Sequence, residues 1–167
     1  MLFLTMRALH VVLAAAWFGA VLFTTLQLGP ALDEAGPAGG QLMNIMVRRG
    51  ISKYMASLGG LTVVVGFYLF WRLTGDPAFA GSHRGIAYSA GALTGIIALI
   101  LGGSMIGGSV KKLTALGPKA ASLPDGPERA ALMATMASLR SRVVLFSKIV
   151  SALLFISMVT MALGHLI

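Results

Sequence analysis

The sequence of 167 residues contains no cysteine and only five acidic residues. Without cysteine, the chain forms no disulfide, binds no metal through thiolates and performs no thiol chemistry. Charged residues make up 11% of the chain and hydrophobic residues 57%, whereas an average soluble domain carries about 25% charged residues. So little charge leaves too little polar surface for a protein that meets water on all sides. The composition therefore indicates a membrane protein of one domain.

The sequence also lacks the short motifs of several enzyme classes. It contains no GxxxxGK(S/T) phosphate-binding loop, no HExxH zinc motif and no GxSxG nucleophile motif. None of the acids lies inside a long apolar run, which argues against a carboxylate relay for protons or ions within the membrane. The net charge of +8 comes from basic residues at the ends of apolar runs, a distribution typical of oriented membrane proteins. We therefore expect no nucleic-acid partner.

Four apolar runs are each long enough to cross a bilayer, which takes about 20 residues of helix. We expect four helices, at residues 2–28, 54–73, 85–110 and 143–167. Gly29 and Pro30 are expected to end the first helix, because proline disfavours helix in the residue before it. The predicted fold class is all-α: a four-helix transmembrane bundle that forms a single domain over residues 1–167.

The polar connections predict the orientation and some further helix. Loops 29–53 and 111–142 carry nine lysines and arginines, against three on the other side. This asymmetry places both loops in the cytoplasm, and both termini on the non-cytoplasmic side of a bacterial-type inner membrane. Residues 41–52 are expected to form a short amphipathic segment at the interface. Prolines and glycines predict a loop in the first half of 111–142, and Asp125 with Glu128 fits a capping box that starts a helix there.

Arg7 and His10 interrupt the first apolar run near its start. At spacings of three and four residues, Arg7, His10 and Trp17 fall on one helix face. Lipid offers no hydrogen-bond partner at the depth of His10, so its side chain must meet another helix or a ligand. Ionisable groups inside membranes usually face the bundle interior and mark function. Both interpretations, a hydrogen bond alone and a site residue, stay open.

A histidine inside a helix bundle, with arginines one turn above it, is a workable site for a b-type haem. Imidazole binds the iron, and arginines pair with the propionates at the water boundary. The expected topology brings all the arginines of the non-cytoplasmic side to the end that holds His10. The predicted cofactor-binding residues are His10, Arg7, Trp17, Arg72 and Arg84.

The second axial ligand is less well defined by the sequence. His165 is the other predicted metal ligand, although an interfacial histidine without a partner explains it equally well. Methionines are further candidates by residue type. Two GxxxG steps, at residues 91–95 and 103–107, predict close helix packing, and the room that glycine leaves also suits a flat ring. Copper is the alternative cofactor, because imidazole and thioether groups suit Cu(I), yet the methionines form no cluster with histidine.

The segment RALHVVLAAAWFGAVLF, residues 7–23, places a basic residue three positions before a membrane histidine and follows it with tryptophan and glycine. This pattern resembles the first helix of the HemJ and CopD-like group of small four-helix membrane proteins. The basic segment MVRRGISKYM, residues 46–55, is similar to one found there. The resemblance is clear over about the first third of the chain. HemJ-type members are protoporphyrinogen oxidases that bind haem, and His10 matches the histidine in their first helix. CopD-type members are associated with copper uptake.

HemJ-type oxidases carry a functional lysine in the third helix, whereas residues 85–110 contain none. The resemblance therefore implies a divergent haem-binding relative with a different electron partner. Three functions stay open: a b-haem redox protein that moves electrons or oxidises a porphyrinogen, a copper-handling transport protein, and an accessory subunit of a larger membrane complex. The expected partners are the lipid bilayer, a porphyrin or quinone-like electron partner, and either a second copy of the chain or a larger membrane complex.

Overall fold

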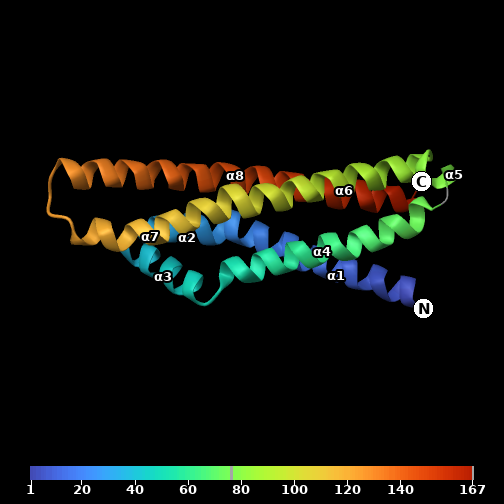
Figure 1. The fold of residues 1–167 in the computed structure, drawn as a ribbon, viewed down its shortest axis with the longest axis horizontal. Helices are drawn as coiled ribbons and strands as arrows, with labels where there is room; N and C mark the ends of the chain where they lie inside the picture. Colours follow the sequence, from blue (N-terminus) through green and yellow to red (C-terminus); the bar gives the residue numbers. More distant parts are fainter. Residues whose placement is uncertain (76, 167) are drawn as a thin grey trace.

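The structure, a computed structural model, describes residues 1–75 and 77–166, and four helical spans run back and forth through it (Figure 1). The spans are Leu2–Glu34, Ile51–Thr74, His83–Ser122 and Pro127–Gly164. Both chain ends and the connection near residue 80 lie at one end of the bundle, called here the terminal end. The other end is called the opposite end. The prediction of an all-α bundle of four membrane-spanning helices is confirmed, because each span is long and apolar enough to cross a bilayer.

The first span is a composite of three helical segments. They are α1 (Leu2–Phe23), the π-helical turn η1 (Thr24–Leu28) and α2 (Gly29–Glu34). The prediction that Gly29 and Pro30 end the helix is wrong, since Pro30 lies in the first turn of α2. A proline ring crowds the carbonyl four residues before it, and a wider π turn relieves such crowding. The Gly29 amide accordingly donates to the Thr24 carbonyl, five residues back.

Helix α3 (Pro37–Arg48) folds back beside α2 and leads into α4 (Ile51–Thr74). The two reversals occur at Gly36 and Gly50, with φ angles of 56° and 90°, which glycine adopts at no steric cost. Gly39 packs so closely on the backbone of Leu32 that a side chain there would overlap it. A short amphipathic helix before α4 was expected, and α3 covers most of that segment. Its position at a membrane interface stays a prediction.

The third span is also longer than predicted. It comprises α6 (His83–Leu101), the π-helical segment η2 (Gly102–Gly107) and α7 (Gly108–Ser122), and the short α5 (Pro77–Ala80) precedes it. The loop predicted after residue 110 is therefore wrong as far as Ser122, although α7 contains Pro118. Helix α7 packs along α8, and such tertiary contacts outweigh weak local propensity. Helix α8 (Pro127–Leu166) begins where the capping pattern predicts.

The buried core is small and lies where α1, α6 and α8 meet. It consists of Trp17, Ala98, Val150 and Leu154. The most extensive contacts join α6 with α8 and α1 with α4. The accessible surface is 10333 Å², whereas a globular protein of the same mass exposes about 7800 Å². The bundle is thus slim, and its outward apolar side chains are compatible with a lipid surrounding.

Candidate functional site

His10 forms a hydrogen bond across the contact between α1 and α4. Its ring atom Nδ1 lies 3.0 Å from the backbone carbonyl oxygen of Thr62. A carbonyl oxygen only accepts, so Nδ1 carries the hydrogen, and the lone pair of the neutral ring lies on Nε2. Within residues 1–75 and 77–166, the structure gives no hydrogen bond to Nε2. The contact therefore fixes the tautomer of the neutral ring, with the hydrogen on Nδ1.

Gly66 makes this contact sterically feasible. A Cβ atom built on Gly66 would lie 2.9 Å from Cε1 of His10 and 3.4 Å from its Nδ1. The imidazole therefore rests on bare backbone, one helical turn beyond the carbonyl that it reaches. The Thr62 hydroxyl donates to the Leu58 carbonyl of its own helix at 2.7 Å, so this buried side chain is satisfied without His10. We call His10, the Thr62 carbonyl and Gly66 the histidine seat.

The seat lies within the membrane-spanning part of the chain. His10 is half-buried, eight residues after the start of α1 at Leu2, which places it about 12 Å along the helix. A single hydrogen bond to a neighbouring helix is what a purely structural histidine needs at such depth. The same bond from the second ring nitrogen also orients histidine ligands in metal proteins. The geometry is compatible with both interpretations.

Trp17 continues the same contact two turns deeper. It is only 5% exposed, and a Cβ on Gly59 would lie 2.9 Å from its Cε2 atom and 2.8 Å from Cδ1 of Leu99. His10 and Trp17 are seven residues apart, and so are the two glycines that they contact, Gly66 and Gly59. Trp17 is thus a packed core residue at the junction of α1, α4 and α6, and its predicted role as a cofactor contact stays a prediction.

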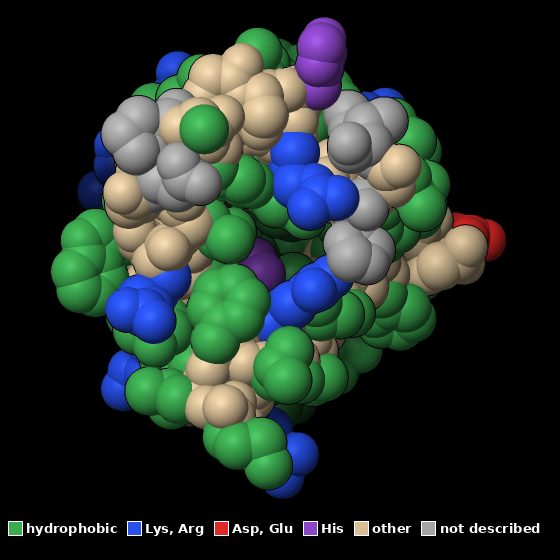
Figure 2. Space-filling view, turned by 90° about the vertical axis from the view of Figure 1, so that its right-hand side faces the viewer, with side chains coloured by type: hydrophobic (Ala, Val, Ile, Leu, Met, Phe, Trp, Pro, Cys, Tyr) green, Lys and Arg blue, Asp and Glu red, His purple; other side chains and the backbone are tan. Residues whose placement is uncertain are grey.

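The three predicted arginines lie at the terminal end, as expected. The Arg84 Nε atom donates to the Gly164 carbonyl at 3.1 Å and so joins α6 to α8. Arg7 lies in α1 and Arg72 in the last turn of α4, and both are exposed. Figure 2 shows that this end is hollowed between basic side chains, with a histidine inside the hollow. His165 lies in the last turns of α8, but its side chain is outside the described part of the chain.

The first GxxxG step holds side chains of α8 rather than empty space. A Cβ on Gly91 would lie 2.7 Å from Cγ of Met161 and 2.9 Å from Oγ1 of Thr160. Ser157 donates a hydrogen bond of 2.7 Å to the Gly91 carbonyl, and its Oγ would lie 3.4 Å from a Cβ on Gly95. Close helix packing is confirmed at this step. The suggestion that these glycines leave room for a flat ring is wrong, because α8 fills that room.

The second GxxxG step differs from the first. A Cβ on Gly103 would meet no atom within 4 Å, and one on Gly107 would meet only the carbonyl of Gly102, in its own segment. Both glycines lie in or at the end of the π-helical segment η2. Segment η2 does contact α8, but neither glycine provides the close helix approach that was predicted at this step.

Metal-ligand side chains are sparse. Over the described residues, no group of three or more histidine, cysteine, aspartate or glutamate side chains is close enough to hold an ion. A haem needs less from the protein, because its ring supplies four ligands and the chain supplies one or two axial ones. The residues therefore fit haem in ligand chemistry, through His10 Nε2. Ligation of copper by His10 with methionine stays a prediction.

Sequence reasoning found His10 but not the two residues of α4 that hold it. A backbone carbonyl has no sequence signature, so Thr62 could not be named in advance. Gly66 could have been, because the seven-residue spacing of His10 and Trp17 matches that of Gly59 and Gly66 in the next helix. In an antiparallel pair of helices, such matched spacings place each large ring opposite a glycine.

No protein-family model, curated protein or solved structure matches the chain. The resemblance to the HemJ and CopD-like group stays a prediction. The geometry of the histidine seat is therefore the basis of the function proposed below.

Proposed function

We propose that this multi-pass membrane protein is a redox protein that binds a b-type haem through His10. The observation that carries the proposal is the hydrogen bond from Nδ1 to the Thr62 carbonyl, which leaves Nε2 as the basic nitrogen. Ligating histidines usually donate their other ring nitrogen in this way, and the bond fixes the tautomer and raises the basicity of the ligand. An imidazole held so is suited to axial ligation of haem iron.

The terminal end supplies groups for the rest of such a ligand. Arg7 and Arg72 are exposed at this end, and guanidinium groups pair with propionate carboxylates at a water boundary. Gly66 and the Thr62 carbonyl position the His10 ring. Haem supplies one-electron chemistry when bound. Side chains of α8 fill the space beside Gly91 and Gly95 of α6. A haem bound to His10 would therefore not lie between these two helices at those glycines.

We further infer that the opposite end faces the cytoplasm of a bacterial-type inner membrane. The segments at that end carry nine of the thirteen basic residues, and such an excess marks the cytoplasmic side. The histidine seat and both termini then lie toward the non-cytoplasmic side. An electron partner, of porphyrin or quinone type, would approach from there.

The proposal is tested by the absorption spectrum of protein purified in detergent from haem-replete cells. We expect a b-type α band on reduction in the wild type and in His83→Ala, a matched variant of an exposed histidine at the start of α6. The band should be lost in His10→Ala, with helicity unchanged by circular dichroism.

A featureless visible spectrum from folded wild-type protein would overturn the proposal. Stoichiometric copper in that protein would favour copper handling. Co-purifying subunits without either cofactor would favour an accessory subunit, in which the hydrogen bond of His10 is structural only.

A further inference from the structure

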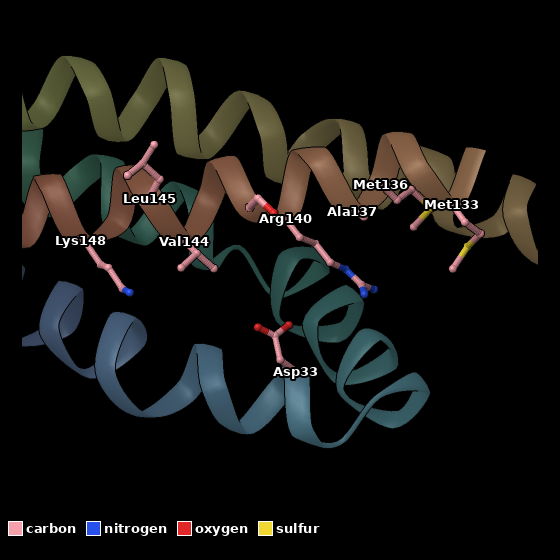
Figure 3. A pocket seen from close by; sticks show the side chains of 9 residues that line it. Asp33, Met133, Met136, Ala137, Arg140, Val144, Leu145 and Lys148 are labelled. Atoms are coloured by element: carbon pink, nitrogen blue, oxygen red, sulfur yellow. The ribbon is translucent and has the colours of Figure 1, made fainter. Parts of the chain in front are cut away.

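A groove of about 620 Å³ lies at the opposite end, between α2 and the first half of α8 (Figure 3). Helix α8 contributes a stripe of side chains, spaced three or four residues apart, that runs from Met133 to Lys148. Helix α2 contributes Asp33, which faces that stripe. The groove shares no residue with the histidine seat. An inference drawn from it therefore goes beyond the proposed function.

The groove sits where the apolar part of the bundle ends. Ser151 of α8 and Thr25 of η1 are joined by a hydrogen bond of 3.2 Å, and Lys148 lies one turn beyond it toward the opposite end. Residues 143–164 of α8 carry Lys148 as their only charged residue and span about 33 Å, close to the hydrocarbon thickness of about 30 Å. Arg140 therefore lies just outside the hydrocarbon and Lys148 just inside it, where its long side chain extends toward the headgroups. Val144 and Leu145 lie between them, at the depth where acyl chains begin.

The groove combines a positive net charge with apolar walls. Arg140 and Lys148 project into it, and Asp33 is the only acid among its lining residues. Within the described ranges, the structure gives no salt bridge from Asp33 to either cation. Val144 and Leu145 line the same groove and are 42% and 56% exposed. Two cations without a salt bridge to Asp33 thus lie beside exposed apolar side chains.

We propose that this groove binds an anionic phospholipid of the surrounding leaflet, with its phosphate between Arg140 and Lys148 and an acyl chain along Val144 and Leu145. Arginine and lysine form charge-assisted hydrogen bonds with phosphate, and basic pockets between membrane helices recognise anionic headgroups. The apolar wall suits an acyl chain, which a free phosphate lacks. The net charge of +1 from Asp33 and the two cations favours a headgroup of net charge −1 over a zwitterionic one.

The test is native mass spectrometry of protein from nanodiscs that contain equal parts of phosphatidylglycerol, phosphatidylethanolamine and phosphatidylcholine. We expect the wild type to retain phosphatidylglycerol selectively. The double variant Arg140→Gln/Lys148→Gln should weaken retention roughly 25-fold, at about 5-fold for each charge. The matched control Arg48→Gln/Arg49→Gln removes the same charge from the same end, outside the groove, and should change retention little.

Asp33→Asn gives a readout that misfolding cannot imitate. Removing the carboxylate raises the positive charge of the groove, so retention of phosphatidylglycerol should rise about 5-fold. A fall in retention of phosphatidylethanolamine in this variant, with no gain for phosphatidylglycerol, would show a zwitterionic occupant instead. Equal losses in the two double variants, equal retention of all three lipids, or displacement by millimolar inorganic phosphate would each overturn the proposal.

Discussion

The two ends of the bundle are held together in different ways. Toward the terminal end, side chains bridge helices that are distant in sequence: His10 to Thr62, Ser157 to Gly91, and Arg84 to Gly164. The bond from Ser151 to Thr25 also joins two helices, one turn before the groove begins at Lys148. Beyond that bond, toward the opposite end, the side-chain hydrogen bonds that the structure gives for the described residues all span three or four positions, within one helix or at its start. The groove between α2 and α8 lies at that looser end.

The difference shows what glycine contributes to a membrane bundle. Where a glycine faces another helix, as at Gly59, Gly66 and Gly91, the backbones approach and a ring or hydroxyl reaches across. In lipid no hydrophobic force draws helices together, so close packing and interhelical hydrogen bonds hold the helices against one another. At the opposite end, the close glycine contact is local, between Gly39 and Leu32 of the α2–α3 hairpin. Helix α7 packs along α8 at this end, whereas α2 and α8 leave the groove between them.

Replacing Gly59 should give the largest loss of stability. A leucine there would collide with Trp17 and Leu99, whose atoms lie within 2.9 Å of a Cβ, and we expect a loss of about 3 kcal/mol in the free energy of unfolding. The neighbouring variant Gly60→Leu is the control, because a Cβ there meets nothing within 4 Å. Denaturant titration in detergent, followed by circular dichroism, measures both. Equal losses would mean that close approach at glycine does not hold the terminal end.

Gly50→Ala should be the next most damaging change, and its effect arises at the opposite end. Nothing lies within 4 Å of a Cβ on Gly50, but its φ angle of +90° is unfavourable for alanine. We expect the free energy of unfolding to fall by about 1–2 kcal/mol. Gly40→Ala, in the helical region of α3 with open space around it, should be neutral or slightly stabilising. The same unfolding titration compares the two. A neutral Gly50→Ala would show that the α3–α4 turn relaxes freely.

Ser157→Ala removes one interhelical hydrogen bond without changing the packing volume much. Because the bond to Gly91 is buried, we expect a loss of about 0.6 kcal/mol, the average for such bonds in membranes. Ser104→Ala is the control, since its hydroxyl bonds only to the Ile100 carbonyl of its own turn. A similar loss in both variants would contradict the role given to interhelical bonds.

The smallest effect is expected at the surface of the opposite end. Asp125 and Arg129 form an ion pair whose side chains are 92% and 41% exposed. Such pairs contribute about 0.5 kcal/mol or less and are screened by salt. Asp125→Asn should therefore shift the unfolding midpoint slightly at low ionic strength and not at all in 1 M salt, a concentration at which the screening length is about 3 Å. A shift that persists in salt would mean that this end is more tightly held than the structure indicates.

Much of the fold followed from the sequence because span length is a local property. Each apolar run had to be helical in lipid, and His10 was conspicuous as an ionisable group inside one of them. The course of the chain past Pro30 was not predictable in the same way. The π turn before Pro30 and the packing of α7 on α8 depend on contacts between distant parts of the chain. Proline and glycine in the sequence indicate only the local preference of the backbone.

Whether His10 binds haem iron is tested most directly by pulsed electron paramagnetic resonance of the oxidised protein labelled with ¹⁵N-histidine. We expect a nitrogen hyperfine coupling from an iron-bound histidine in the wild type and in Gly60→Val. Gly66→Val should alter this coupling, because the new side chain displaces the ring whose Cε1 atom lies 2.9 Å from a Cβ at that position. His10→Ala should abolish the coupling. An unchanged coupling in His10→Ala, or no haem signal in the wild type, would contradict the proposed role of the histidine seat.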